Sequence, residues 1–104
     1  MNLLTEELRA KLPRLYTQEA DPDPMVYAEF FLPGTGWTWY VTEGEERDGD
    51  FLFFGFVVGL ESEFGYFLLS ELESVRTPIF GLRVERDVHF TEGRFTDVVP
   101  APDI

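Results

Sequence analysis

The chain has 104 residues, of which 20 are acidic and 8 are basic, and its net charge at pH 7 is −12. This length fits one ordinary domain, and we expect a single domain over residues 1–104. The chain contains no cysteine, which excludes disulfides, thiolate metal sites and a cysteine nucleophile. Its negative charge would repel a phosphate backbone, so we do not expect it to bind nucleic acid directly.

The N-terminal segment does not have the pattern of a secretion signal, because Glu6 and Glu7 interrupt it and no basic residue precedes them. The longest apolar run covers residues 51–60, which is about half the length of a membrane-spanning helix. We therefore expect a cytoplasmic protein that does not enter a membrane.

A short amphipathic helix is predicted near the N-terminus. Thr5 suits the N-cap, acidic residues follow it, and basic residues stand in the last turn. Leu4, Leu8 and Leu12 recur at helical spacing and define an apolar face. A proline then ends the helix, and the Asp-Pro pairs further on predict an extended linker over residues 14–24.

A β-hairpin is predicted after this linker. Residues 25–32 and 37–42 are rich in strand-forming residues that alternate between two faces. Pro33 and Gly34 between them suit the centre of a type II turn. Residues 44–50 contain no apolar anchor, so we expect a solvated, mobile loop there.

A second hairpin is predicted from residues 51–60 and 64–69. The first of these runs is apolar on both faces, which indicates a central strand covered on part of each side. Gly55 and Gly59 within it suggest a bulge or a close backbone approach.

The last third of the chain predicts a short helix and an edge strand. Ser70 and Glu73 have capping-box spacing, so a helix of one to two turns should begin there. Residues 84–90 alternate as an edge strand, and residues 91–104 read as a loosely held tail. The fold we expect is α+β, an antiparallel sheet of about four to five strands with both helices packed on one face.

Several short motifs are shared with a known bacterial family. They are Leu3-Leu4-Thr5, Leu12-Pro13 with Tyr16, Trp37-Thr38-Trp39-Tyr40 with Glu43, Phe54-Gly55, Glu63-Phe64-Gly65-Tyr66, Leu69-Ser70-Glu71-Leu72 and Glu85-Arg86-Asp87-Val88-His89-Phe90. On these motifs the chain resembles the domain of unknown function family 2958, with Phe64 where the family pattern has leucine. The resemblance implies no established activity. It implies a short protein often encoded on plasmids, integrative elements and phages, near replication, partition and antirestriction genes.

The only histidine of the chain lies in a polar segment near its end. On a strand, Asp87 and His89 would share one face and could do acid–base work or ligate a metal. The structural alternative is a polar edge strand in which Arg86 pairs with a carboxylate. A single histidine makes a poor zinc site, so we expect no metal and no cofactor.

Three glutamates lie at predicted strand ends. Glu43, Glu61 and Glu63 could converge there to bind a hard cation or to divide acid and base roles. The structural alternative is that acids at sheet ends are simply solvated, since a chain this acidic places carboxylates near one another by chance.

Aromatic residues are concentrated on the first two predicted strands. Tyr27, Trp37, Trp39 and Tyr40 would form a stacking platform or a protein-binding surface if one set faces solvent, and otherwise they fill the core. Tyr40 is opposite in phase to the two tryptophans, so we expect Tyr40 to be the exposed member.

The sequence supports three hypotheses of function. The first is a protein-binding accessory factor of a mobile genetic element whose unidentified partner handles nucleic acid, in its boldest form a DNA-mimic inhibitor that uses the acidic surface. The second is a small hydrolase or metal-dependent enzyme centred on Asp87 and His89. The third is single-stranded nucleic-acid binding, which requires Arg83, Arg86 and Arg94 to gather beside the aromatic rings. No nucleotide loop or nucleophile motif is present, so we expect a non-enzyme.

Overall fold

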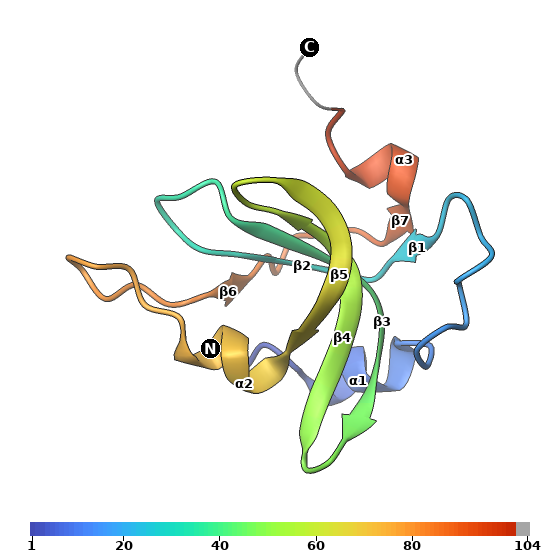
Figure 1. The fold of residues 1–104 in the computed structure, drawn as a ribbon, viewed down its shortest axis with the longest axis horizontal. Coiled ribbons are helices and arrows are strands. Elements are labelled where there is room, and N and C mark those ends of the chain that lie inside the picture. Colours follow the sequence, from blue (N-terminus) through green and yellow to red (C-terminus); the bar gives the residue numbers. More distant parts are fainter. Residues whose placement is uncertain (102–104) are drawn as a thin grey trace.

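The computed structural model describes residues 1–101, and its centre is a five-stranded antiparallel sheet with the strand order β5-β4-β3-β2-β6 (Figure 1). A separate two-stranded ladder joins β1 to β7. In chain order the elements are α1 (Glu6–Lys11), β1 (Met25–Val26), β2 (Ala28–Phe31), β3 (Thr38–Arg47), β4 (Asp50–Val58), β5 (Ser62–Leu68), α2 (Leu69–Ser74), β6 (Glu85–Arg86), β7 (Gly93–Arg94) and α3 (Phe95–Val98).

The first helix forms as its sequence predicts. The Thr5 side chain accepts a hydrogen bond from the Leu8 N–H at 3.1 Å, which satisfies one of the free donors at the helix start. Leu4, Leu8 and Leu12 are all buried. The predicted N-cap and apolar face are therefore confirmed.

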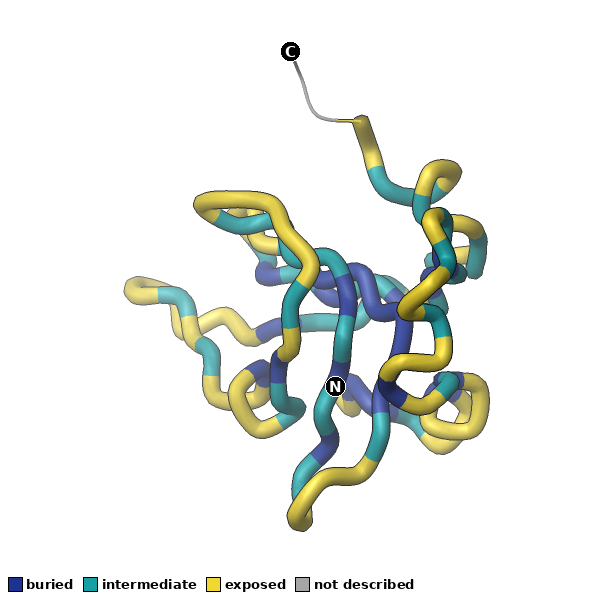
Figure 2. Tube along the Cα trace, turned by 45° about the vertical axis from the view of Figure 1, so that its right-hand side comes forward, coloured by how far each residue is buried: buried dark blue, intermediate teal, exposed yellow. Residues whose placement is uncertain are grey.

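One face of the sheet is closed by α1 and α2, and we call it the closed face. Phe30 on β2 and Phe53 on β4 are fully buried there, with their ring centroids 5.5 Å apart. Leu8 of α1 and Leu72 of α2 belong to the same apolar cluster. Figure 2 shows the buried positions concentrated along the strands and the exposed ones in the connections. The predicted α+β fold, with an antiparallel sheet and two helices packed on it, is confirmed.

The turn between β2 and β3 is also as predicted. The Thr35 N–H donates to the Leu32 carbonyl at 3.2 Å, and Gly34 has φ +76°, the left-handed conformation that a type II turn requires at this position.

The prediction of a mobile loop over residues 44–50 is wrong. β3 continues to Arg47 and pairs directly with Asp50, the first residue of β4. Asp48 and Gly49 have φ values of 52° and 82°, and two consecutive left-handed residues make the tight turn that matches the twist of a hairpin. Acidic side chains alone gave no strand signal, yet they are compatible with a strand whose outer positions face water.

The capping box expected at Ser70 and Glu73 is wrong by two residues. The helix begins at Leu69, and Glu71 accepts a hydrogen bond from the Leu68 N–H at 2.9 Å. Ser70 instead donates its hydroxyl proton to the Asp50 carboxylate, which lowers the pKa of Asp50. The Ser70 hydroxyl, which the sequence pattern assigns to the helix cap, is therefore hydrogen-bonded to Asp50 outside the helix.

The predicted linker (residues 14–24) and the predicted tail (residues 91–104) both contain turns or strand pairing. Within residues 14–24, positions 15–20 form successive turns and not an extended linker. Within residues 91–104, expected as a loosely held tail, β7 pairs with β1, and the Phe95 N–H donates to the Pro24 carbonyl at 2.8 Å. The final three positions of that tail, 102–104, lie outside the described residues.

Candidate functional site

The sheet surface opposite the helices is lined by aromatic side chains, and we call it the aromatic face. It consists of Tyr40 on β3, Phe54 and Phe56 on β4, and Phe64 and Tyr66 on β5. Phe54 pairs across the strands with Tyr66, and Phe56 pairs with Phe64, with ring centroids 4.8 Å and 5.1 Å apart. Phe64 is 43% exposed and Tyr66 is 51% exposed, so this face is only partly covered.

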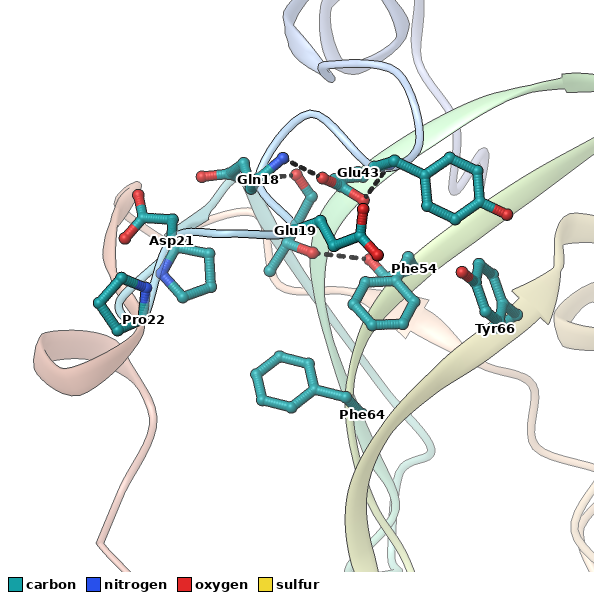
Figure 3. Close-up of a pocket in the computed structure, with 11 residues that line it drawn as sticks. Gln18, Glu19, Asp21, Pro22, Glu43, Phe54, Phe64 and Tyr66 are labelled. Carbon is teal, nitrogen blue, oxygen red and sulfur yellow. Dashed lines mark hydrogen bonds between the residues drawn. The ribbon is translucent and has the colours of Figure 1, made fainter.

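Two hollows adjoin the aromatic face and share Phe64. The first, which we call the cleft, has a volume of about 310 Å³ and lies beneath the turn that follows α1 (Figure 3). The second, which we call the groove, has a volume of about 830 Å³ and runs along Tyr40, Phe56 and Phe95. The cleft is lined by Tyr16, Gln18, Glu19, Asp21, Pro22, Pro24, Thr42, Glu43, Phe54, Phe64 and Tyr66.

A β-bulge places a carboxylate in the cleft. The register between β3 and β4 shifts between Val41 and Glu43, so one extra residue, Thr42, lies on β3. The shift reverses the alternation of side chains, and Glu43 therefore pairs with Phe54 of the aromatic face. Gly55 permits the close approach of the strands here, since a Cβ at this position would lie 1.9 Å from the Tyr40 carbonyl oxygen.

Glu43 holds the wall of the cleft in place. Its side chain is almost fully buried, and its carboxylate accepts hydrogen bonds from the backbone N–H groups of Tyr16 and Gln18. Tyr16 has φ +73°, a left-handed conformation that helps to direct both N–H groups at one acceptor. A buried carboxylate thus fixes the turn that carries Tyr16 over the sheet.

The Gln18 side chain fastens the same wall to the strands. Its amide donates to the carbonyls of Met25 and Thr42 at 3.0 Å and 2.9 Å, and its oxygen accepts from the Met25 N–H at 2.7 Å. These bonds leave Gln18 a structural role. They also explain why residues 14–24 are ordered against the sheet.

The cleft is acidic as well as aromatic. Three of its eleven lining residues are carboxylic acids, Glu19, Asp21 and Glu43, and none is a lysine, arginine or histidine. The neighbouring Tyr16 hydroxyl, then partial burial, raises the pKa of Tyr66, and the carboxylates of Glu19 and Glu43 act in the same direction. The site therefore offers aromatic rings and negative charge to whatever enters it.

The predicted pair of Asp87 and His89 does not lie on a strand. β6 ends at Arg86, and residues 87–90 form a turn in which the Asp87 carboxylate accepts from the His89 backbone N–H at 2.9 Å. The His89 side chain is exposed beside a shallow hollow. The structure therefore does not place the imidazole and the Asp87 carboxylate on one strand face.

Arg86 does not make the ion pair expected of it. Within residues 1–101 no carboxylate lies in ion-pair distance of its guanidinium, and its buried Nε has no hydrogen-bond partner. Its neighbour across the strands is Phe30, so the side chain is directed to the closed face.

The three predicted glutamates do not converge. Glu43 lies in the cleft, whereas Glu61 and Glu63 are exposed and border a different hollow beside Trp37. The described residues contain no group of three or more His, Asp or Glu side chains arranged to hold a metal ion.

Tyr40 is not the exposed aromatic residue that its phase suggests. It is 7% exposed, and burial, followed by the charge of Glu29, raises its pKa. Tyr40 pairs across the strands with Phe56, and both residues border the groove together with Phe95 of α3, residues that lie far from Tyr40 in sequence. Trp37 is the more exposed residue, and its ring stacks on Trp39 with centroids 5.9 Å apart.

The arginines do not gather beside the rings. Arg86 borders a hollow together with Tyr27, but the hollows that Trp37 and Tyr40 border contain no arginine. Arg94 pairs with Asp21 at 3.2 Å, and Arg83 is exposed in the segment before β6. The arrangement required for single-stranded nucleic-acid binding is therefore not present in these described residues.

Most of the site could not be found from the sequence alone. Among its residues the sequence indicates only Glu43 and Tyr40 as candidates, and it predicts different surroundings for both. Tyr16 and Glu19 reach the cleft through the turn after α1, which has no strand or helix pattern. The available signal was the apolar character of both faces of residues 51–60, which indicates a second aromatic surface.

Comparison with known proteins gives one match. A family model described as "Protein of unknown function (DUF2958)" matches residues 3–98. No curated protein and no solved structure matches the chain. No helix within the described residues is long and apolar enough to cross a membrane.

Proposed function

The chain belongs to the DUF2958 family of proteins of unknown function, and we propose that it is a protein-binding accessory factor whose binding site is the aromatic face. The setting that the resemblance implies, a mobile genetic element, is part of this proposal. The partner that we propose is a basic protein that handles nucleic acid.

The observation that carries the proposal is the exposure of large aromatic rings on a concave surface. Phe64 and Tyr66 leave about half of each side chain in water, and both border the cleft. Phe64 also borders the groove. Exposed aromatic residues beside a hollow are typical of protein-binding hot spots, because they bury a large apolar area at low cost in side-chain entropy.

The charge of the molecule supports a basic partner. The net charge is −12, and the cleft wall adds carboxylates next to the rings. Complementary charge speeds association and disfavours acidic competitors. A nucleic-acid-handling protein presents such a basic surface, and occupation of that surface by this acidic chain would inhibit it as a DNA mimic does.

The test is affinity capture with a tagged full-length chain from a nuclease-treated lysate of the native host, read by quantitative mass spectrometry. The test variant carries Phe64→Ser and Tyr66→Ser, which remove the exposed rings and leave the closed face intact. We expect one partner to be enriched by the wild type and lost by at least about tenfold in this variant, as removal of hot-spot residues predicts.

A matched control variant carries Ile79→Ser and Phe80→Ser. These residues are 86% and 82% exposed in the segment before β6 and do not border the cleft or the groove. The control should retain the partner. Equal loss in both variants, or retention in the test variant, would contradict the proposed site.

A further inference from the structure

The geometry points to a specific role for the cleft: we infer that it receives a single cationic side chain, lysine or arginine, from the partner. This inference rests on the proposed function, because it names the chemistry by which the same site would recognise a basic protein. The two hollows differ in their chemistry. The groove is lined mainly by apolar side chains, whereas the cleft is lined by acidic and aromatic ones, so we assign the cationic side chain to the cleft.

The charge of the cleft is not balanced by cations in the part of the protein that the structure describes. Arg94 reaches Asp21 from outside the lining, but within the described residues no cation pairs with Glu19 or Glu43. The hydrogen bonds to Glu43 come from backbone N–H groups and not from a cation. An incoming cation would meet the exposed carboxylate of Glu19, and the buried carboxylate of Glu43 lies in the same lining.

Two side chains of the cleft use their hydrogen-bond donors within the protein. The Gln18 amide is already used by the Met25 and Thr42 carbonyls, and the Thr42 hydroxyl donates to the Phe54 carbonyl at 3.1 Å. Of the polar side chains that remain in the cleft, the Glu19 carboxylate only accepts, and the Tyr16 and Tyr66 hydroxyls can donate or accept. A ligand that donates hydrogen bonds fits this lining, because each of these groups can accept.

The aromatic rings of the cleft lie close to one another and to its carboxylates. The ring centroid of Tyr66 lies 6.5 Å from that of Tyr16 and 4.8 Å from that of Phe54, and Phe64 stacks on Phe54 at 5.8 Å. Figure 3 shows the rings of Phe54, Phe64 and Tyr66 below the carboxylates of Glu19 and Glu43. Aromatic faces next to carboxylates attract ammonium and guanidinium groups through cation–π and ionic interactions.

The size of the cleft is sufficient for one long side chain. Its volume of about 310 Å³ is at the lower end of the range for small-molecule pockets, which is roughly 300–1,000 Å³. A bare metal ion is a poorer fit, because it needs several converging oxygen ligands and the described residues provide no such group.

The experiment is an NMR titration of the ¹⁵N-labelled full-length chain with three blocked tripeptides that carry lysine, arginine or neutral norleucine between two glycines. We expect the lysine and arginine peptides to shift the backbone signals of Tyr16, Gln18 and Phe54, and the norleucine peptide to leave them in place. Added salt should weaken the effect, because part of the attraction is ionic.

Two variants identify the groups responsible. Tyr66→Leu keeps apolar bulk and removes the ring, and Glu19→Gln removes one charge without disturbing a described hydrogen bond. Each should weaken binding of the cationic peptides by roughly three- to tenfold. Glu73→Gln, at an exposed position of α2, removes the same charge at a distance from the cleft and should leave binding unchanged.

Shifts that are as large with norleucine as with lysine, or no shift with either cationic peptide, would overturn the inference. So would equal weakening by Glu19→Gln and Glu73→Gln. If the captured partner depends on Phe64 and Tyr66 while these titrations are silent, the proposed function stands and the cationic pocket is wrong. If the titrations succeed while no partner depends on the rings, the pocket stands and the proposed function fails.

Discussion

The two faces of the sheet are formed by the same strands but differ in how far they are buried. On β4, Phe53 is fully buried beneath the helices, whereas its neighbour Phe54 points to the aromatic face and borders the cleft. On the closed face, α1 and α2 supply leucines that complete the packing. On the aromatic face, Phe64 and Tyr66 remain partly in water. Alternation along a strand therefore gives one buried face and one partly exposed face, and the second is the binding surface that we propose.

The largest expected contrast between the faces is in stability. Phe53→Ala should lower the free energy of unfolding by about 3–5 kcal/mol, because it leaves a cavity in the buried cluster. Phe64→Ala should cost about 1 kcal/mol or less, since its side chain is already half in water. Chemical denaturation of both variants checks this, and equal losses would show that the aromatic face is part of the folding core.

The next test concerns the close strand approach at the bulge. Gly55→Ala should destabilise by about 1–3 kcal/mol or more, because the new methyl group would overlap the Tyr40 carbonyl oxygen. Gly65 is the cross-strand neighbour of Gly55, and a Cβ at that position would meet no atom within 4 Å. Gly65→Ala should therefore be neutral or slightly stabilising in the same denaturation experiment. Similar losses in both variants would contradict the described register.

Glu43 tests whether the wall of the cleft depends on its carboxylate. Glu43→Ala should cost about 1–3 kcal/mol, because it leaves the N–H groups of Tyr16 and Gln18 without their acceptor. Hydrogen exchange at these two amides should rise in the variant. Glu46→Ala, which removes only an exposed ion pair with Arg9, should cost less than about 1 kcal/mol. If hydrogen exchange at these amides is unchanged in Glu43→Ala, Glu43 does not hold the wall of the cleft in place.

The smallest expected effect is a pH dependence at Glu29, which pairs across the strands with Tyr40. Burial, and then the charge of Asp87, raises the pKa of Glu29. Folding therefore favours the protonated form of the Glu29 carboxyl. This form stabilises the folded protein at low pH, and the stabilisation is lost as the pH rises above 4.5, the ordinary pKa of a glutamate. The Glu29→Gln variant should therefore melt at a higher temperature than the wild type at pH 7. Below pH 4.5 the two proteins should melt at the same temperature. Glu73→Gln provides the baseline for the loss of one charge.

The sequence predicts the parts of the fold that depend on local patterns. The Thr5 cap, the leucines of α1 and the turn at Gly34 follow from capping and from backbone preference, and they are present. The central position of β4 follows from its two apolar faces. These features need no knowledge of which distant residues meet.

The candidate site depends on events that local patterns do not encode. The bulge at Thr42 reverses the alternation on β3 and carries Glu43 to the aromatic face. The turn that brings Tyr16 over the sheet is fixed by that same carboxylate, which lies 27 positions away in the chain. Tyr40 is buried beside Phe56 of the neighbouring strand and borders the groove with Phe95 of α3. In each case a contact between distant segments decides the exposure of the side chain.

The most direct test of the binding site is photo-crosslinking from the aromatic face itself. A photoreactive phenylalanine analogue would replace Phe64 in one full-length protein and the exposed Glu73 of α2 in another, with both expressed in the native host. We expect a discrete crosslinked protein from position 64 and none from position 73. Crosslinks to the same protein from both positions, or from position 73 alone, would contradict the assignment of binding to the aromatic face.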